Sequence, residues 1–406
     1  MRFFTADYLF PIVTEPIRGG VLVMEDDGTV REILDPEKID YEIPDLESYP
    51  GFLCPGFINT HCHLELSWAK GAIEADRGLD HFLRTLDGLR RNVDPEWAKT
   101  CAENEGNEML MNGTVAVADV ANSTITAEYK ENSPIVFHTF CEVFASNPAS
   151  ADKAFERINQ LCDQFRSLGK NNRASVTPHA PYSLSPELFR LISRQSSLNG
   201  FPISMHHLES VDEIHFFREA SGPIMQRRML YNPGIEPFQA TGGSPIRFLS
   251  EYFQRYQPML LVHNTYNREE DIAEANHYFD NLGWCFCPNA NRFIENKLPD
   301  IELFRRHSCL ITLGTDSLAS NTSLSMVEEM KTILDHVPGI PLNELLTWAT
   351  RNGAGFLGFD QLGSFEKGKK PGVIHIGNVD IQRVSLLPGS TSGLLMMHGY
   401  DSLHQS

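Results

Sequence analysis

Residues 55–63 read PGFINTHCH, an apolar run that ends in two histidines separated by one residue. Alternate residues of a strand point to the same face, so the imidazoles of His61 and His63 point the same way. Two imidazoles on one face suit two ligands of a single metal ion. A solvated histidine pair is the alternative, and the apolar strand before the motif favours a metal site.

This run is the first of a series of short apolar segments that alternate with longer amphipathic ones. The amphipathic segments include Ala151–Leu168 and Arg268–Phe279. Strands that alternate with helices predict an α/β fold with parallel strands, and eight strands suggest a closed (β/α)8 TIM-like barrel. The eight predicted strands are Phe52–Ile58, Thr114–Val120, Ile135–Val143, Ala174–Thr177, Pro202–Met205, Met259–Val262, Trp284–Phe286 and Leu310–Leu313.

The two ends of the chain have a different character, with short β-like runs between turn residues. We therefore predict a small β-sheet domain from residues 1–53 and 364–406, and a barrel domain from residues 54–363. The runs at the ends are Tyr8–Pro11, Gly20–Met24, Val30–Ile33 and, after the turn-rich residues 363–372, Val373–Ile376.

Further metal-type residues stand where other apolar runs end, which in a barrel is the catalytic face. His206 ends the fifth run, with Glu209 three residues later, and His207 is a competing ligand. His263 ends the sixth run. The alternative is a histidine at the barrel rim whose hydrogen bonds are satisfied and which has no role in the site. Asp316 ends the eighth run, where a carboxylate is costly unless it is bonded. A helix N-cap is the alternative for Asp316.

We predict one divalent metal ion at this face, Zn(II) or Fe(II), held in an open site. Such a metal lowers the pKa of bound water toward neutral. His179 ends the fourth run, and we expect it to face the substrate or, alternatively, to hold its loop by a hydrogen bond.

The net charge of −19 argues against nucleic acid and anionic lipid as partners, since both require basic patches. The N-terminal residues lack the features of a signal peptide, and no apolar run reaches membrane-spanning length. Eight scattered cysteines are expected to be reduced thiols. These features predict a cytoplasmic protein that binds neither nucleic acid nor a membrane.

Taken together, the motifs from Pro55 to Gly372 resemble the amidohydrolase superfamily, in particular its cytosine, guanine and adenosine deaminases and its chlorohydrolases. The resemblance implies that His61, His63, His206 and Asp316 are the metal ligands. It also implies that Glu209 passes a proton to the substrate ring and that His263 orients water and steadies the developing oxyanion. The fourth run lacks the lysine of two-metal relatives, so a single metal is expected. A homodimer would be usual for this superfamily.

Other positions are open to two interpretations. The segment from Cys287 to Asn291 resembles the deaminase Cys-Pro-x-Ser-Asn motif with alanine in place of serine, and leaves Asn291 as a site-shaping residue. Glu65 binds the substrate or makes a structural hydrogen bond. Arg292 meets a substrate carboxylate or lies on the surface. The sequence motif around Glu65 is similar to that of a branch of the superfamily that includes 6-aminodeoxyfutalosine deaminases.

These interpretations predict a hydrolytic deaminase that releases ammonia from an amino-substituted heterocycle. Asp316 would take a proton from water, Glu209 would protonate the ring nitrogen, and His263 would hydrogen-bond the incoming oxygen. A chlorohydrolase or a formimino deiminase is the alternative enzyme. A non-catalytic barrel that binds a ligand is the alternative from another class.

Overall fold

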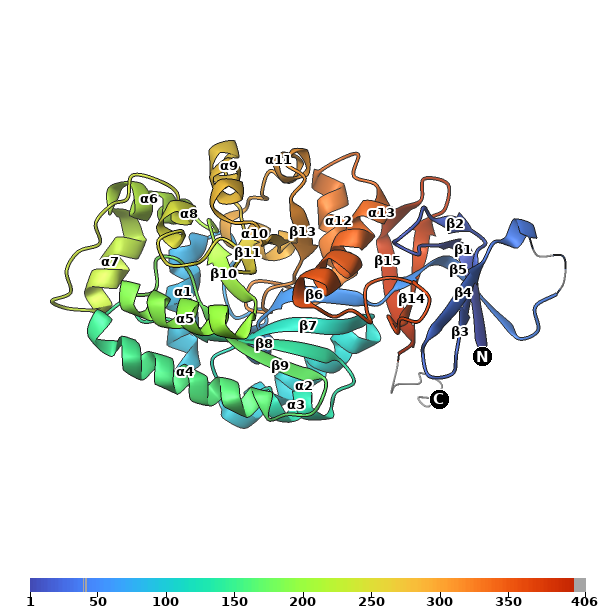
Figure 1. The fold of residues 1–406 in the computed structure, drawn as a ribbon, viewed down its shortest axis with the longest axis horizontal. Helices are drawn as coiled ribbons and strands as arrows, with labels where there is room; N and C mark the ends of the chain where they lie inside the picture. Colours follow the sequence, from blue (N-terminus) through green and yellow to red (C-terminus); the bar gives the residue numbers. More distant parts are fainter. Residues whose placement is uncertain (39, 41, 398–406) are drawn as a thin grey trace.

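The structure is a computed structural model that describes residues 1–38, 40 and 42–397, and it places a barrel beside a sheet built from both chain ends (Figure 1). In the barrel, two sets of four parallel strands run in chain order. The barrel strands are β6 (Phe57–Cys62), β7 (Thr114–Ala121), β8 (Val136–Val143), β9 (Asn172–Pro178), β10 (Ile203–His207), β11 (Met259–His263), β12 (Leu282–Phe286) and β13 (Leu310–Leu313).

Backbone hydrogen bonds join the two sets of strands and close the barrel. The His206 N–H donates to the carbonyl of His179 at 2.9 Å, across β9 and β10. On the other side, the Thr315 N–H donates to the carbonyl of His61 at 3.0 Å, across β13 and β6. The predicted (β/α)8 architecture is therefore confirmed.

Helices follow the barrel strands and lie around them in Figure 1. Several begin with the expected N-terminal signals: Asp94, Ser185 and Asp300 each accept a hydrogen bond from a backbone N–H of the first turn. The helices are α1 (Gly78–Arg90), α2 (Pro95–Met111), α3 (Ala127–Asn132), α4 (Ala151–Arg166), α5 (Pro186–Asn199), α6 (Val211–Glu219), α7 (Gly222–Tyr231), α8 (Pro245–Leu249), α9 (Glu269–Tyr278), α10 (Pro288–Glu295), α11 (Ile301–Arg306), α12 (Met326–His336), α13 (Leu342–Thr347) and α14 (Gly353–Leu357).

The two amphipathic segments chosen from the sequence correspond to α4 and α9. None of the helices in the described part of the chain has the length and apolar character needed to cross a bilayer. All eight cysteines fall within the described residues and are free thiols, most of them buried.

Both chain ends contribute to one separate sheet, as the sequence predicted, in the order β15-β14-β5-β1-β3-β4 with β2 beside β1. Residues 398–406, which the expected sheet domain included, lie outside the described residues. The strands are β1 (Arg2–Leu9), β2 (Ile17–Arg18), β3 (Val21–Met24), β4 (Val30–Leu34), β5 (Leu46–Pro55), β14 (Val373–Asp380) and β15 (Ser385–Met396).

The predicted first barrel strand, Phe52–Ile58, is wrong in its bounds because it joins parts of two strands. β5 ends at Pro55 and belongs to the terminal sheet, while the barrel strand β6 begins at Phe57. Gly56 makes the connection where space is tight: a Cβ atom there would lie 2.4 Å from Cγ1 of Val115. The end of β5 and the start of β6 are both apolar, so periodicity could not separate the two strands.

Strand β5 also explains how the sheet is attached to the barrel. Phe52 and Cys54 are buried in the large cluster that contains the barrel core, whereas Leu53 between them packs in the sheet's own cluster with Phe4 and Leu22. The alternation of a strand thus gives each face of β5 a separate apolar environment. The terminal sheet packs directly against the barrel.

Candidate active site

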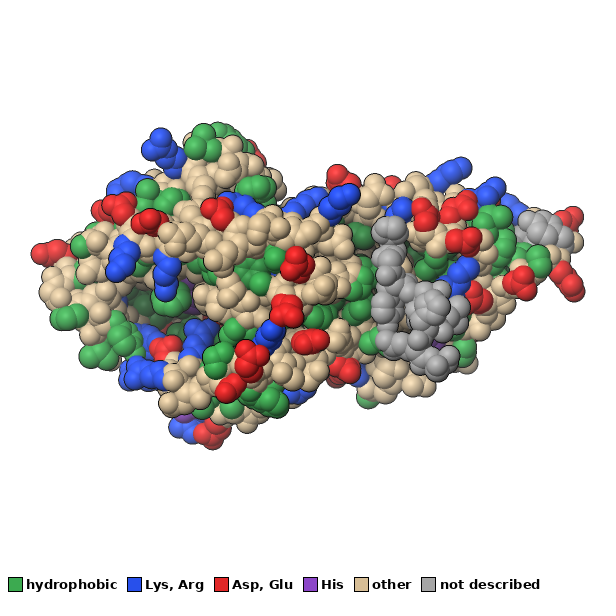
Figure 2. All heavy atoms as spheres, turned by 90° about the horizontal axis from the view of Figure 1, so that it is seen from below, with side chains coloured by type: hydrophobic (Ala, Val, Ile, Leu, Met, Phe, Trp, Pro, Cys, Tyr) green, Lys and Arg blue, Asp and Glu red, His purple; other side chains and the backbone are tan. Residues whose placement is uncertain are grey.

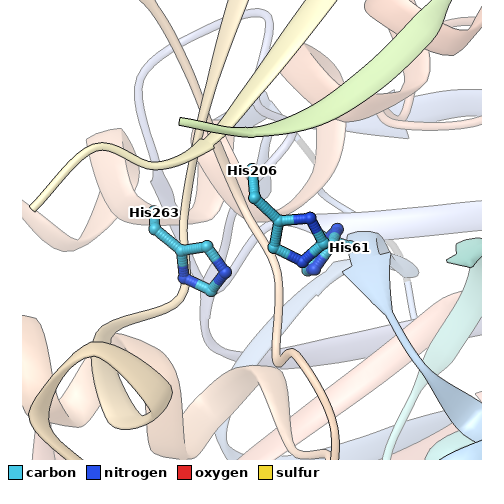
Figure 3. Close-up of side chains that lie close together, drawn as sticks. All are labelled: His61, His206 and His263. Atoms are coloured by element: carbon cyan, nitrogen blue, oxygen red, sulfur yellow. The ribbon is translucent and has the colours of Figure 1, made fainter. Parts of the chain in front are cut away.

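The histidines predicted as ligands come together at the carboxyl ends of the barrel strands. Figure 3 shows His61, His206 and His263 pointing toward one another from β6, β10 and β11. The ring centroids of His61 and His206 lie 5.0 Å apart. Oδ1 of Asp316 lies 3.5 Å from Nε2 of His61 and 3.6 Å from Nε2 of His63. The structure therefore brings the predicted ligand set into one cluster.

The chemistry of this cluster fits a divalent metal ion. Burial lowers the pKa of His61 to about 4 and that of His63 well below its usual value, so both imidazoles are neutral and can donate lone pairs. Both ring nitrogens of His61 are buried and lack a hydrogen-bond partner among the described residues. A buried polar atom without a partner is costly, and a metal bond would satisfy it.

A carboxylate and a correctly oriented third imidazole complete the fit. Burial would raise the pKa of Asp316, but His61, whose Nε2 lies 3.5 Å from Oδ1, and the other imidazoles around it hold that pKa below its usual range. Nδ1 of His206 donates to the carbonyl of His179 at 2.8 Å, which leaves Nε2 as a lone-pair donor. The competing residue His207 faces away: its Nδ1 donates to Oδ1 of Asn264 at 3.0 Å.

Glu209 stands beside the cluster as a buried acid. Its Oε1 lies 3.7 Å from Nε2 of His263, and its side chain is 6% exposed. Burial raises the pKa of Glu209 to about 8, and the negative charges of Asp316 and Glu295 act in the same direction. A carboxyl group with such a pKa is largely protonated at neutral pH and can donate a proton.

Asn291 fixes the orientation of His263. Nδ1 of His263 donates to Oδ1 of Asn291 at 2.9 Å, and Nδ2 of Asn291 donates to the carbonyl of His263 at 3.1 Å. The Nε2 atom of His263 is consequently left facing the cluster with its lone pair. The site-shaping role expected for Asn291 thus has a concrete form, which is to hold one ring.

The strand ends that carry these residues have an uncommon backbone conformation. Leu208, His263, Asn264 and Asp316 all have left-handed φ values, of 44°, 74°, 57° and 55°. Each such residue costs about 1–2 kcal/mol relative to the right-handed conformation. Strain of this kind persists where the surroundings hold it, and it concentrates at functional sites.

The cluster lies at the base of a cavity of about 470 Å³. Figure 2 shows hydrophobic and basic side chains gathered around a hollow in the barrel part of the molecule. Much of the wall is apolar, with leucines and Phe82 from α1, and polar groups interrupt it. The polar groups that line the cavity include Asp80, Arg90, Glu142, Asp212, Arg227 and Arg228.

The four predicted substrate contacts lie in different places. His179 lines the cavity, with its ring centroid 4.7 Å from that of His206. Asn291, Glu65 and Arg292 lie outside the wall that the described residues form. Glu65 is buried and accepts hydrogen bonds from Ser123, including one of 2.7 Å from its hydroxyl. These contacts are of the kind expected if Glu65 makes a structural hydrogen bond and does not bind the substrate. Arg292 is exposed, as expected if it lies on the surface and does not meet a substrate carboxylate.

Sequence reasoning missed Glu142 and the arginines of the cavity wall. Glu142 lies near the end of β8, a position type that could have singled it out in the same way as Asp316. Its Oε1 is 3.6 Å from Nδ1 of His206. Arg90 and Arg228 stand on α1 and α7, where the sequence carries no motif that would indicate a role.

Comparisons with known proteins agree with the geometry. An aminodeoxyfutalosine deaminase from Nitratiruptor sp. is 28% identical over 84% of this chain and 80% of its own length. An adenosine deaminase from Helicobacter pylori is 25% identical over 86% of each chain. The structure of H. pylori aminofutalosine deaminase in complex with methylthio-coformycin is similar, with a TM-score of 0.81, 22% identity and 95% of each chain covered.

A zinc complex of an atrazine chlorohydrolase from Arthrobacter aurescens has the same fold, with a TM-score of 0.77, 17% identity and coverage of 99% of this chain and 97% of its own. The family description of amidohydrolases matches residues 52–377. The predicted enzyme class, a hydrolase acting on carbon–nitrogen bonds with deaminases as relatives, is confirmed. The chain belongs to the amidohydrolase family.

Proposed function

We propose that this chain is a zinc-dependent deaminase of an adenosine-like nucleoside. The single observation that carries the proposal is the placement of Glu209, a buried acid with a pKa raised to about 8, next to His263 and a histidine–aspartate cluster. Deamination of a purine ring needs a proton donor for the ring and a base for water at the same carbon atom. The relatives named as adenosine and aminodeoxyfutalosine deaminases support the same substrate class.

Each residue of the cluster has a chemical task in this proposal. Asp316 is ionised and accepts a proton from the attacking water. Glu209 is protonated and donates to the ring nitrogen beside the carbon atom under attack. His263, held by Asn291, hydrogen-bonds the incoming oxygen. When the carbon–nitrogen bond breaks, the proton that Asp316 received leaves with the amino group as ammonia. The attacking oxygen becomes a carbonyl oxygen, and the proton that it gives up restores the acid form of Glu209.

His61, His63, His206 and Asp316 would hold the metal ion, which supplies Lewis acidity and lowers the pKa of water toward neutral. Zinc is bound in the structures of two similar proteins, an adenosine deaminase from Xanthomonas campestris and the chlorohydrolase. Three imidazoles and a carboxylate are ligands that Zn(II) accepts.

The cavity is large enough for more than a purine base. Its volume of about 470 Å³ falls in the range of pockets that enclose drug-sized ligands. Leu79, Phe82 and Leu86 of α1 give one wall an apolar surface that would suit a hydrophobic group attached to the sugar. We therefore favour nucleosides with a substituent over free bases.

Ammonia release from a panel of substrates tests the proposal. The zinc-reconstituted protein would be given adenosine, methylthioadenosine, S-adenosylhomocysteine, 6-aminodeoxyfutalosine, guanine, cytosine and a chlorotriazine. We expect ammonia from an adenine nucleoside, and its loss in Asp316→Asn with zinc content checked separately. Release of chloride from the triazine, with no ammonia from any substrate, would refute the proposal and favour the chlorohydrolase alternative. A cytoplasmic location and a homodimer stay predictions.

A further inference from the structure

The loop between β10 and α6 carries Glu209 and is held by a second buried carboxyl group. Glu213 is fully buried in the first turn of α6. Its Oε1 accepts the Glu209 N–H at 2.8 Å, and its Oε2 accepts the Leu208 N–H at 3.0 Å. Both oxygens of one side chain are thus used on two successive amides of the loop.

The loop needs this support because its backbone is in an uncommon conformation. Leu208 has a φ of 44°, in the left-handed region that branched residues rarely adopt, and its side chain is only 1% exposed. The turn at Leu208 sets the direction in which the next side chain, that of Glu209, leaves the backbone. Without Glu213 the two buried amides would lose their acceptors, and the loop would relax to satisfy them elsewhere.

We propose that Glu213 is a positioning residue that holds the turn at Leu208, and so aims the carboxyl group of Glu209 at the cluster. The inference rests on the proposed role of Glu209 as proton donor. Glu213 is separate from the cavity wall that the described residues form, so it acts through Glu209 and not on the substrate. A proton donor displaced by about 1 Å can lose about a hundredfold in rate.

The chain offers a matched control in α9. Asp271 stands at the same position of its helix as Glu213 does in α6, and its carboxylate accepts the Arg268 N–H at 2.8 Å. It is 5% exposed and lies away from the cavity wall formed by the described residues. Asp271→Asn therefore removes a buried carboxylate of the same structural kind without reaching Glu209.

The test compares Glu213→Gln, Asp271→Asn, Glu209→Gln and the double variant Glu209→Gln/Glu213→Gln. The glutamine side chain keeps one acceptor oxygen and turns an N–H group toward a backbone N–H. We expect Glu213→Gln to lower kcat by about tenfold to a hundredfold, with KM within about twofold and zinc at one equivalent. Asp271→Asn should leave kcat within about twofold of the wild type.

The double variant separates positioning from a general structural effect. If Glu213 acts only through Glu209, its replacement should cost nothing further once Glu209 is glutamine, because interacting residues are non-additive. Losses that multiply, or an unchanged kcat in folded Glu213→Gln, would overturn the inference. If Glu213→Gln does not fold, Glu213→Asp tests the same contact, since its shorter side chain keeps the carboxyl group and moves its oxygens away from the two amides.

Hydrogen exchange of the Leu208 and Glu209 amides gives a result that does not depend on turnover. Both should be protected in the wild type and in Asp271→Asn, and exposed in Glu213→Gln. Fast exchange of both in the wild type would also overturn the inference. If the wild type releases no ammonia from the substrate panel, the proposed function fails, while the exchange measurement still decides whether Glu213 holds the loop.

Discussion

The pH dependence of turnover offers a direct test of Glu209 as proton donor. Burial raises its pKa from 4.5 to about 8, so at pH 7 about nine in ten molecules carry the proton. With an ordinary pKa of 4.5 the protonated fraction would be only about 0.3%. The position of Glu209 therefore raises the concentration of the active form by roughly 300-fold at neutral pH.

The sign of the effect follows from the form that works. Because the protonated carboxyl donates, kcat should be constant below about pH 7 and should fall tenfold for each unit above about pH 8. The amide of Glu209→Gln has no proton of suitable acidity, so kcat should drop by about 10²–10⁴-fold and the alkaline decline should disappear. Ammonia release at saturating nucleoside, from about pH 5.5 to pH 10, gives both quantities.

Glu329→Gln is the control for this measurement. Glu329 is fully buried and its pKa is also raised to about 8 by burial, but it binds Asn289 and Asn321 outside the cavity wall formed by the described residues. Its replacement should leave the alkaline decline in place. A Glu209→Gln protein that keeps more than a tenth of the wild-type kcat, or keeps the decline, would refute the reasoning.

Other perturbations have equally definite outcomes. Lys130→Met breaks a fully buried ion pair with Asp119 (2.6 Å) and should cost about 3–5 kcal/mol in urea unfolding. The double variant Lys130→Met/Asp119→Asn should recover part of the lost unfolding free energy. Equal stability of Lys130→Met and the double variant would contradict this expectation. Asn291→Leu frees the ring of His263 and should lower kcat about tenfold or more in ammonia release; it should also lower the melting temperature, because the buried Nδ1 of His263 loses its acceptor. Arg292→Ala should keep kcat/KM within about twofold, because the side chain is exposed; a larger loss would place it at the substrate. Removal of metal by dipicolinate should lower the melting temperature and stop turnover, and zinc should restore both.

The elements that the sequence predicted well are those with a strong local signal. Eight apolar runs, each ending in or near a polar residue, were enough to predict the barrel and to place His206 and His263 on one face. The histidines of β6 could be paired from strand alternation alone. These features depend on neighbours in the chain, which is what periodicity measures.

The parts that the sequence did not predict depend on contacts between distant segments. The sequence around Pro55 does not indicate that β5 pairs with β1 and β14 in the terminal sheet. Nor does it indicate that the first barrel strand begins only after Gly56. The choice between substrate contact and structural hydrogen bond for Glu65 required the position of Ser123. Arg90 and Arg228 enter the cavity only through the packing of α1 and α7, which no local pattern specifies.

The closure of the barrel has a consequence for how the proposed metal site would be assembled. The carbonyl of His61 accepts the N–H groups of both Thr315 and Asp316, each at 3.0 Å, so the first and last strands meet at two of the ligands. A growing chain possesses three of the predicted ligands long before Asp316 is synthesised. In the proposed site, full coordination would wait until the last strand docks, so tight metal retention would mark a completely assembled barrel. A chain damaged or stalled before that point would hold the metal ion with fewer ligands and would release it more readily to a chelator.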